Sequence, residues 1–273
     1  MKIIIDAMGG DNAPQAPVVG AVRAKETLGV DICFVGKQEI IKEELDKIGK
    51  SAADYEIVDA RDEITMHDDP ATAIRRKKES SMVVALNMLK NGQGDAVVSA
   101  GSTGALLSGA TLITKRIKGI RRAAMAPIIP NGDKGVVLMD CGANAECTPE
   151  YLLQFAYMGS FYAQKMMELE NPRVGLLNIG AEDTKGTQLQ LDTYKLLQAA
   201  NDEGRINFIG NVEGTDVLNG KADVVIADGF TGNVLLKSIE GVAKFMLKQL
   251  KGVFYQNTAT KLAAVVLKPG LKE

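Results

Sequence analysis

The chain has 273 residues, of which 46% are hydrophobic and 24% are charged. This composition is typical of a globular protein and excludes a disordered or collagen-like chain. The formal net charge is −2 and Trp is absent, so the sequence offers neither the basic surface nor the stacking side chains of a nucleic-acid-binding protein.

Cysteine and histidine are scarce. The three cysteines are Cys33, Cys141 and Cys147, and the single histidine is His67. An odd number of cysteines without a C-x-x-C pair argues against a disulfide framework or a zinc site, and we expect no metal. The first apolar run is too short for a secretion signal, and no run is long enough to span a membrane. We therefore expect a cytoplasmic protein.

Short apolar segments alternate with longer helical patterns along the chain. Strands are predicted at 2–6, 32–36, 95–99, 135–140, 173–178, 206–210 and 223–227. Helices are predicted between them at 18–27, 38–48, 71–89, 104–117, 149–169, 186–200 and 233–250. Most strand segments are continuously apolar, as in strands buried on both faces. The pattern predicts an α/β fold with a mostly parallel sheet and helices on both faces.

The sequence shows no internal repeat and no linker, so we predict one α/β domain over residues 1–273. Residues 233–268 differ because they have the pattern of two helices with no strand after them. We expect these helices to form a projecting hairpin.

Common catalytic motifs are missing. The chain contains no P-loop, no G-x-G-x-x-G fingerprint and no G-x-S-x-G elbow. His67 lies beside two aspartates, a context typical of a surface turn, which argues against a serine–histidine hydrolase.

Polar, glycine-rich loops instead follow the predicted strands. In the first loop, Gly9 and Gly10 allow close backbone approach to a ligand, and Asp6, Asp11 and Asn12 supply polar groups. Ligands bind beyond the carboxyl ends of parallel strands, so these loops are candidates for one shared site. A turn followed by a helix cap is an equally good interpretation of this loop alone.

The second loop is rich in small residues, with Ser102, Thr103 and Gly104 at the start of a predicted helix. Exposed amides and hydroxyls at a helix N-terminus form a general anion-binding arrangement. Simple helix capping by Ser102 or Thr103 is the alternative.

Three later loops carry further polar groups. Asn144 follows the strand ending at 140, where it can orient a carbonyl or phosphate oxygen. Lys185 lies near a helix start, which favours anions over cations, so we expect it to meet a bound anion. Asp228 and Asn233 follow the last strand, where they can complete the site or only cap the next helix.

A basic run, formed by Arg75, Arg76, Lys77 and Lys78, contrasts with the neutral total charge. Such a run is usually a solvated surface. The functional alternative is docking of an acidic partner or a phosphate-bearing substrate, which salt would weaken.

Several of these loops together resemble the bacterial phosphate acyltransferase family PlsX. The motifs occur in order as DAMGGDNAP (6–14), AIRRKKESSM (73–82), SAGSTGALL (99–107), DCGAN (140–144), NIGAEDTKG (178–186), GNVEG (210–214) and DVVIADGFTGNVLLKSIEG (223–241). Each motif alone would be a weak signal, whereas the ordered set is specific.

The resemblance implies a Rossmann-like three-layer α/β/α sandwich related to phosphotransacetylases and isopropylmalate-type dehydrogenases. It implies transfer of an acyl group from acyl-[acyl-carrier protein] to inorganic phosphate, without a cofactor, for phospholipid biosynthesis. It further implies a homodimer, soluble or peripheral at the inner face of the membrane, whose product feeds a membrane glycerol-3-phosphate acyltransferase.

The sequence departs from the family pattern in two places. Ala181 stands where the family usually has an acid, and the family's chains continue into a glycine-rich segment and a final His-Gly stretch. The present sequence ends at Glu273, so we expect that tail to be absent.

We assign phosphate to the Ser102–Gly104 turn together with Lys185, and carbonyl polarisation to Asn144 or Asn233. The aspartates at 6, 11 and 228 are expected to orient donors, and the run at 75–78 is expected to dock the carrier protein. The apolar hexamer 262–267 is expected to pack in a dimer, with a peripheral membrane contact as the alternative.

Three rival functions remain open at this stage. A phosphate acetyl- or butyryltransferase would use coenzyme A thioesters, and a non-catalytic module would only bind the carrier protein or a lipid. A dehydrogenase is third, without a nucleotide fingerprint to support it.

Overall fold

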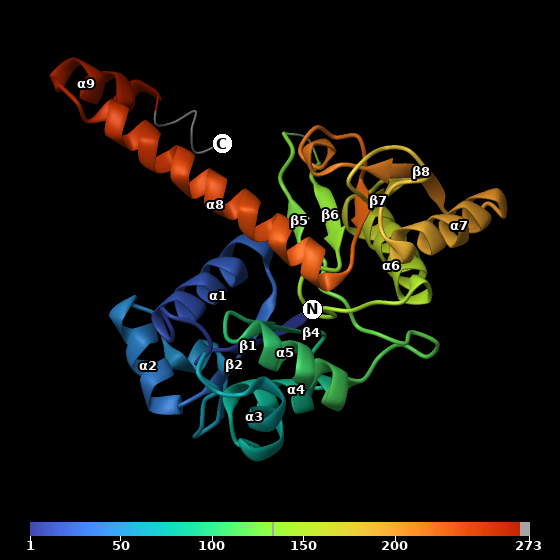
Figure 1. The fold of residues 1–273 in the computed structure, drawn as a ribbon. Helices are drawn as coiled ribbons and strands as arrows, with labels where there is room; N and C mark the ends of the chain where they lie inside the picture. The colour runs from blue at the N-terminus through green and yellow to red at the C-terminus, as the bar shows by residue number, and fades with distance from the viewer. Residues whose placement is uncertain (133, 268–273) are drawn as a thin grey trace. The chain divides into compact units, whose positions relative to one another are not determined.

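The computed structural model describes residues 1–132 and 134–267. The chain divides into two compact units, Met1–Ala123 and Ala124–Glu273, and each unit has its own sheet (Figure 1). The sequence pattern predicted one sheet, and this part of the prediction is wrong. Apolar runs show that a strand is buried, but they do not show which strand lies beside it. The prediction of a single domain stays a prediction.

The first unit contains a parallel sheet in the order β3-β2-β1-β4. Its elements are β1 (Lys2–Asp6), α1 (Gln15–Leu28), β2 (Asp31–Gly36), α2 (Gln38–Lys47), β3 (Glu56–Asp59), α3 (Pro70–Arg76), α4 (Ser81–Lys90), β4 (Ala96–Ser99) and α5 (Thr103–Gly109). The register places Asp6 beside Ser99, so the loops after β1 and β4 leave the sheet at the same edge.

Two predictions for this unit need correction. The helix predicted at 71–89 is two helices, because the chain leaves helical geometry at Lys77 and Ser80 caps α4 by accepting a hydrogen bond from Val83 N–H (3.4 Å). Strand β3 was missed, because its four residues contain only two apolar ones.

The second unit contains a sheet in the order β5-β6-β9-β7-β8, which is parallel except for the β5–β6 pair. Its elements are β5 (Ile128–Ile129), β6 (Val136–Met139), α6 (Pro149–Met166), β7 (Arg173–Leu177), α7 (Gln188–Asp202), β8 (Asn207–Val212), β9 (Val224–Ile226), α8 (Gly229–Phe254) and α9 (Thr258–Leu267). β6, β9 and β7 are adjacent, so the loops at 140, 228 and 178 follow neighbouring strand ends.

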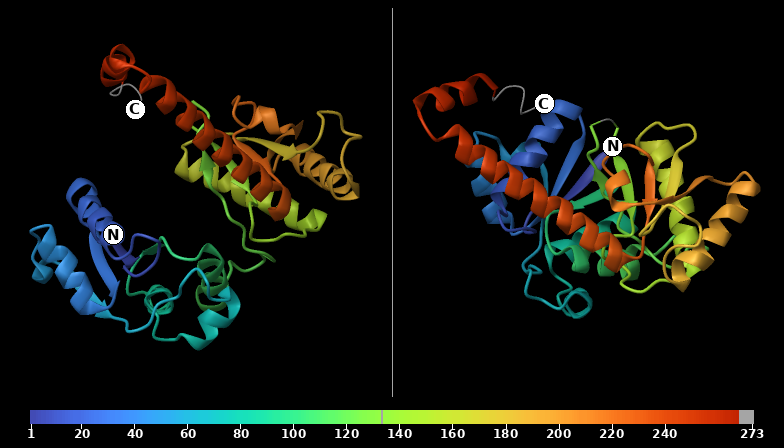
Figure 2. Two further views of the ribbon diagram at one scale, coloured as in Figure 1. Left: turned by 60° about the vertical axis from the view of Figure 1, so that its left-hand side comes forward. Right: turned by 45° about the horizontal axis from the view of Figure 1, so that its top comes forward.

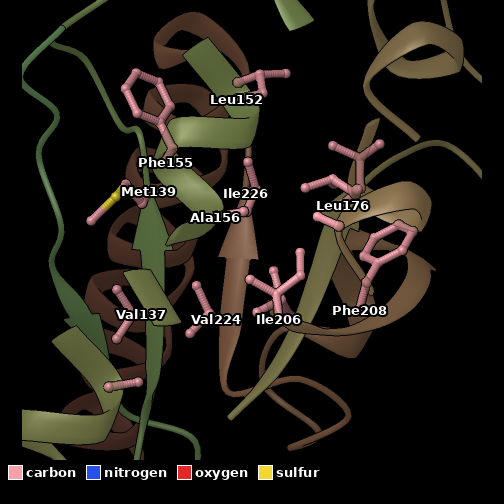
Figure 3. Packing of buried hydrophobic residues seen from close by; sticks show 14 of the residues in the cluster. Val137, Met139, Leu152, Phe155, Ala156, Leu176, Ile206, Phe208, Val224 and Ile226 are labelled. Atoms are coloured by element: carbon pink, nitrogen blue, oxygen red, sulfur yellow. The ribbon is translucent and has the colours of Figure 1, made fainter. Parts of the chain in front are cut away.

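Helices cover both faces of this sheet, which confirms the three-layer α/β/α architecture. On one face, Leu152 and Phe155 of α6 belong to one buried cluster with strand residues that include Met139 and Ile226 (Figure 3). On the other face, Leu235, Leu236 and Ile239 of α8 pack over a second set of strand residues that includes Leu138 and Val225. Burying each such side chain contributes about 1.5–3 kcal/mol. The stacked layers fix the strand ends from which the loops project.

The C-terminal helices α8 and α9 confirm the predicted pair of helices, although α8 begins at Gly229, earlier than expected. Among the described residues, which end at 267, no strand follows α8. Beyond its packed first turns, α8 extends away from the sheet of its own unit (Figure 2). Several apolar side chains on this extension, among them Phe245 and Leu247, are more than half exposed. Within residues 1–132 and 134–267, no helix has the length and hydropathy needed to cross a membrane. Lys268 of the predicted hairpin lies outside the described residues.

Candidate active site

Asp6 organises the loops of the first unit. Its side chain is 1% exposed, and its two carboxylate oxygens accept hydrogen bonds from the hydroxyls of Ser81 (2.6 Å) and Ser99 (2.7 Å). The Ser99 Oγ in turn accepts a hydrogen bond from Gly101 N–H (3.1 Å). Asp6 therefore orients the hydroxyls of Ser81 and Ser99, and its predicted preference for this role over proton transfer stays a prediction.

The two glycines of the first loop are required by close packing on the second loop. A Cβ at Gly9 would lie 2.7 Å from Asp6 Oδ2 and 2.9 Å from Gly101 N. At Gly10 the φ of +105° is one that side chains disfavour, and a Cβ would lie 2.8 Å from Ala100 O. The structure thus brings the 6–14 and 99–104 loops together, as we predicted for a shared edge.

The anion-binding assignment for Ser102, Thr103 and Gly104 receives mixed support from their surroundings. Ser102 is buried, and its hydroxyl caps α5 by accepting a hydrogen bond from Ala105 N–H (3.4 Å). Thr103 and Gly104 are exposed in the first turn. The helix-cap interpretation therefore describes Ser102, and the phosphate role of this turn stays a prediction.

A cavity of about 310 Å³ lies beside the first loop, and Gly10, Asp11, Gly101 and His67 contribute to its lining. His67 lies in an exposed turn, as its sequence context predicted. Its place at the cavity was missed, because a lone histidine in a polar turn carries no motif. Asn12 lies next to the loop residues that line the cavity, and is exposed.

The basic run at 75–78 is only partly available to a partner. Arg75, Arg76 and Lys78 are exposed. Lys77 instead donates hydrogen bonds to Asp68 (2.9 Å) and to the carbonyl of Glu63 (2.8 Å). The hydrogen bond from Lys77 is the main cause that lowers the pKa of Asp68 to about 2. Lys77 thus holds the loop before α3, and Arg75, Arg76 and Lys78 remain exposed. The docking role of the run stays a prediction.

In the second unit, the carboxylate of Asp140 is the centre of the first loop. Asp140 is fully buried, and its Oδ1 accepts hydrogen bonds from the backbone N–H groups of Met125 (3.0 Å), Cys141 (2.7 Å) and Ala143 (3.2 Å). Its Oδ2 accepts from the backbone N–H (2.7 Å) and the Nδ2 (3.0 Å) of Asn144. The sequence shows an acid at this position but does not indicate its role. The five hydrogen bonds that the Asp140 carboxylate accepts show that it shapes the loop.

The start of α8 packs directly on this loop. Asp228 caps the helix, since its oxygens accept hydrogen bonds from the N–H (2.9 Å) and hydroxyl (2.7 Å) of Thr231. Gly229 N–H donates to the carbonyl of Asn144 (2.8 Å). Asn233 is exposed, and its side-chain carbon and oxygen would lie 3.8 Å from a Cβ at Gly142. Asn144, Asp228 and Asn233 are therefore brought together at one end of α8.

Lys185 lies in the exposed loop between β7 and α7, three residues before the helix begins. Its backbone N–H donates to Glu182 O (3.2 Å), and its carbonyl accepts a hydrogen bond from Asn178 Nδ2 (3.0 Å). No carboxylate in the part of the chain that the structure describes pairs with its ammonium group. An ordered backbone thus presents a cation that is open to an external anion.

The thiols of Cys33 and Cys141 are unsuited to nucleophilic catalysis. Burial is the main cause that raises the pKa of the Cys141 thiol to about 11, with the nearby Asp140 carboxylate acting in the same direction. Burial likewise raises the pKa of Cys33 to about 11. A thiol with such a pKa is protonated at neutral pH and reacts slowly. Among the described residues, no group of three potential metal ligands comes together.

Comparison with known proteins decides the family. A family model described as "Fatty acid synthesis protein" matches residues 1–273. A protein of Alkaliphilus oremlandii named "Phosphate acyltransferase" is 49% identical over 272 residues, covering 100% of this chain and 80% of that protein. A protein of the same name from Clostridium acetobutylicum is 48% identical over 274 residues, covering 100% of this chain and 82% of that protein. The chain belongs to the phosphate acyltransferase (PlsX) family.

Solved structures agree on the fold of this family member. A phosphotransacetylase from Staphylococcus aureus superposes with a TM-score of 0.65 at 18% identity, covering 89% of this chain and 82% of that chain. A phosphotransacetylase from Streptococcus pyogenes gives the same score at 20% identity. The similarity confirms the predicted Rossmann-like α/β class.

The candidate residues thus fall into two clusters. The N-terminal loop cluster comprises residues 6–12 and 99–104, whose backbones pack closely. The C-terminal loop cluster comprises residues 140–147, 178–187 and 228–233, which follow the neighbouring strands β6, β7 and β9 of one sheet. The prediction that Lys185 and the Ser102–Gly104 turn bind the same phosphate stays a prediction.

Proposed function

We propose that this chain transfers an acyl group from the thioester of an acyl carrier protein to inorganic phosphate. The observation that carries the proposal is the 49% identity, over 272 residues, to a protein named phosphate acyltransferase. In the reaction, a phosphate oxygen attacks the thioester carbonyl carbon and the carbon–sulfur bond breaks. The proton of the phosphate ends on the released thiol, and the products are an acyl phosphate and the free carrier protein.

In such a reaction the protein positions the two substrates and does not supply a nucleophile of its own. Phosphate is itself the nucleophile, and holding it against the carbonyl can lower the barrier by roughly 7–11 kcal/mol. Donors placed at the developing oxyanion typically add about 3–4 kcal/mol each. The absence of a nucleophilic motif from the sequence and the backbone-lined loops of both clusters are consistent with this demand.

Within the C-terminal loop cluster, we assign Lys185 to the charge of phosphate and Asn144 or Asn233 to the thioester carbonyl. Asp140 and Asp228 serve as acceptors that fix the amide donors and the helix end around them. In the N-terminal loop cluster, Asp6 and the paired glycines hold the loops that contain Asp11, Thr103 and Gly104.

The carrier protein is proposed to dock on the exposed cations of the basic run. We expect the double substitution Arg75→Glu and Arg76→Glu to raise the KM for acyl carrier protein, with little change for a small acyl-CoA donor. Salt should raise the wild-type KM in the same direction, because exposed charges are screened. Steady-state kinetics, with the concentration of each acyl donor varied in turn, measure the two KM values. Arg61→Glu, at another exposed arginine, is the matched control. Equal KM values for the variant and the wild type would contradict the docking assignment.

We further propose a homodimer in which the exposed apolar face of α8 beyond residue 240 is covered by a second copy. Exposed apolar patches of this kind mark interaction surfaces. Light scattering should then give twice the 29.1 kDa mass of the chain, and a monomeric mass would reject the proposal.

The acyl phosphate product would be consumed by a membrane glycerol-3-phosphate acyltransferase, which places the protein in phospholipid synthesis in the cytoplasm or at the membrane's inner face.

Release of the free carrier thiol on addition of phosphate tests the proposed reaction. We expect release from acyl carrier protein to require phosphate and to yield one acyl phosphate, trapped with hydroxylamine, per thiol. Faster release from acyl-CoA would identify a coenzyme A-dependent enzyme. No phosphate-dependent release from either donor would leave only the binding-module interpretation.

A further inference from the structure

The loop that contains Lys185 has few packing contacts on one side. A cavity of about 630 Å³ lies between this loop and α7, and Asp183 and Thr184 line it from the loop. A hollow removes the van der Waals contacts that would otherwise hold the segment. The position of Lys185 must therefore depend on specific hydrogen bonds.

Two asparagines at neighbouring strand ends provide these bonds. Asn178, directly after β7, donates to the carbonyl of Lys185 (3.0 Å). Asn211, on the adjacent strand β8, is 3% exposed and donates its Nδ2 to the carbonyl of Glu182 (2.7 Å). The same carbonyl accepts the backbone N–H of Lys185 (3.2 Å). The peptide groups on both sides of the lysine Cα are thus fixed, one by Asn178 and one through Glu182 by Asn211.

The lysine side chain is guided as well. A Cβ at Gly180 would lie 3.2 Å from Lys185 Cγ and 3.6 Å from its Cδ, so the aliphatic stem passes close to the glycine backbone. The turn before α7 is equally restricted, because Gly186 has a φ of +97° and a Cβ there would lie 2.7 Å from Asn178 Oδ1. The stem therefore leaves the loop in a defined direction.

The stability of the fold alone does not explain an asparagine at position 211. Its Oδ1 is buried and has no hydrogen-bond partner among the described residues. A buried acceptor without a partner destabilises a fold, whereas an apolar side chain of similar shape avoids that cost. The contribution of this amide therefore lies in the one bond that it donates to the Lys185 loop.

We infer that Asn211 is a positioning residue, which holds the Glu182 carbonyl and thereby sets Lys185 at the phosphate that the lysine binds. The inference rests on the role proposed above for Lys185. It adds a residue from β8 that acts on the lysine through the carbonyl of Glu182.

The test compares Asn211→Leu, which keeps the side-chain shape, with Asn211→Ala and with wild type. The matched control is Asn207→Ala, because Asn207 lies at the other end of β8 and donates its Nδ2 to the carbonyl of Asn171 (3.2 Å). For Asn211→Leu we expect unchanged or higher thermal stability together with a kcat/KM for phosphate lowered about 10- to 100-fold. The KM for the acyl donor should change little, and Asn207→Ala should keep both constants.

Hydrogen exchange of residues 181–187, followed by mass spectrometry, gives a readout that does not depend on turnover. Exchange should rise in both Asn211 variants and stay at the wild-type rate in Asn207→Ala. Wild-type exchange in the Asn211 variants, or unchanged phosphate kinetics in a folded variant, would overturn the inference. If wild type itself lacks phosphate-dependent turnover, the proposed function fails, and exchange still decides whether Asn211 orders the loop.

Discussion

Replacing Lys185 with Ala is expected to lower kcat/KM for phosphate by roughly 100- to 1000-fold, the range seen when one preorganised electrostatic group is removed. The side chain is exposed and belongs to no buried cluster, so its loss removes charge without opening the core. Circular dichroism and thermal melting should match wild type. Steady-state kinetics with phosphate as the varied substrate measure the effect.

The control for this experiment is Lys195→Ala. Lys195 is exposed on α7 of the same unit and pairs with Asp192 (3.2 Å). Its removal changes the net charge by the same amount and should leave turnover near the wild-type value. A Lys185→Ala enzyme that turns over at the wild-type rate would reject the phosphate role of the lysine.

The second large effect is expected for Gly232→Ala. A Cβ at this position would lie 2.0 Å from the carbonyl oxygen of Asp140 and 3.2 Å from Cys141 Cα. Both neighbours are backbone atoms, and Asp140 is held by five donors, so neither can move aside. We expect the second unit to lose about 3 kcal/mol or more of stability, the upper range for overpacked sites. Chemical denaturation measures it.

Two glycines of the same helix serve as controls, because a Cβ at Gly241 or Gly252 would meet nothing within 4 Å. Alanine in an open helix interior is favoured over glycine by about 1 kcal/mol. Gly241→Ala and Gly252→Ala should therefore stabilise α8 or leave it unchanged. Equal stabilities for all three variants would show that α8 does not press on the Asp140 loop.

The sequence predicted most of the helices and strands, together with the polar loops that follow the strands, but it missed β3 and β5. Continuous apolar runs such as 136–139 identified buried strands, and the polar residues after them identified the loops. The pairing of the strands could not be predicted, because an apolar run does not indicate which strand lies beside it. The helix break at 77–80 was not predicted; there Ser80 caps α4, and Lys77 donates to Asp68, nine residues earlier in the chain.

Asn211 shows the limit of site prediction most clearly. The strand predicted from the sequence ends at residue 210, so Asn211 is a polar residue just beyond an apolar run, where a surface position would explain it equally well. Its meaning depends on the carbonyl of Glu182, 29 residues away, which only the fold places beside it. Asp140 differs, because an acid directly after an apolar strand already indicated a loop of interest.

The separation of the buried clusters has a consequence for the thermal unfolding of the protein. Each cluster of core residues draws on one unit only: three lie within residues 1–123 and two within residues 124–273. Calorimetry therefore need not give a single two-state peak. A destabilising substitution in the second unit, such as Gly232→Ala, can therefore leave the first unit folded. Limited proteolysis of that variant should then leave a resistant N-terminal fragment.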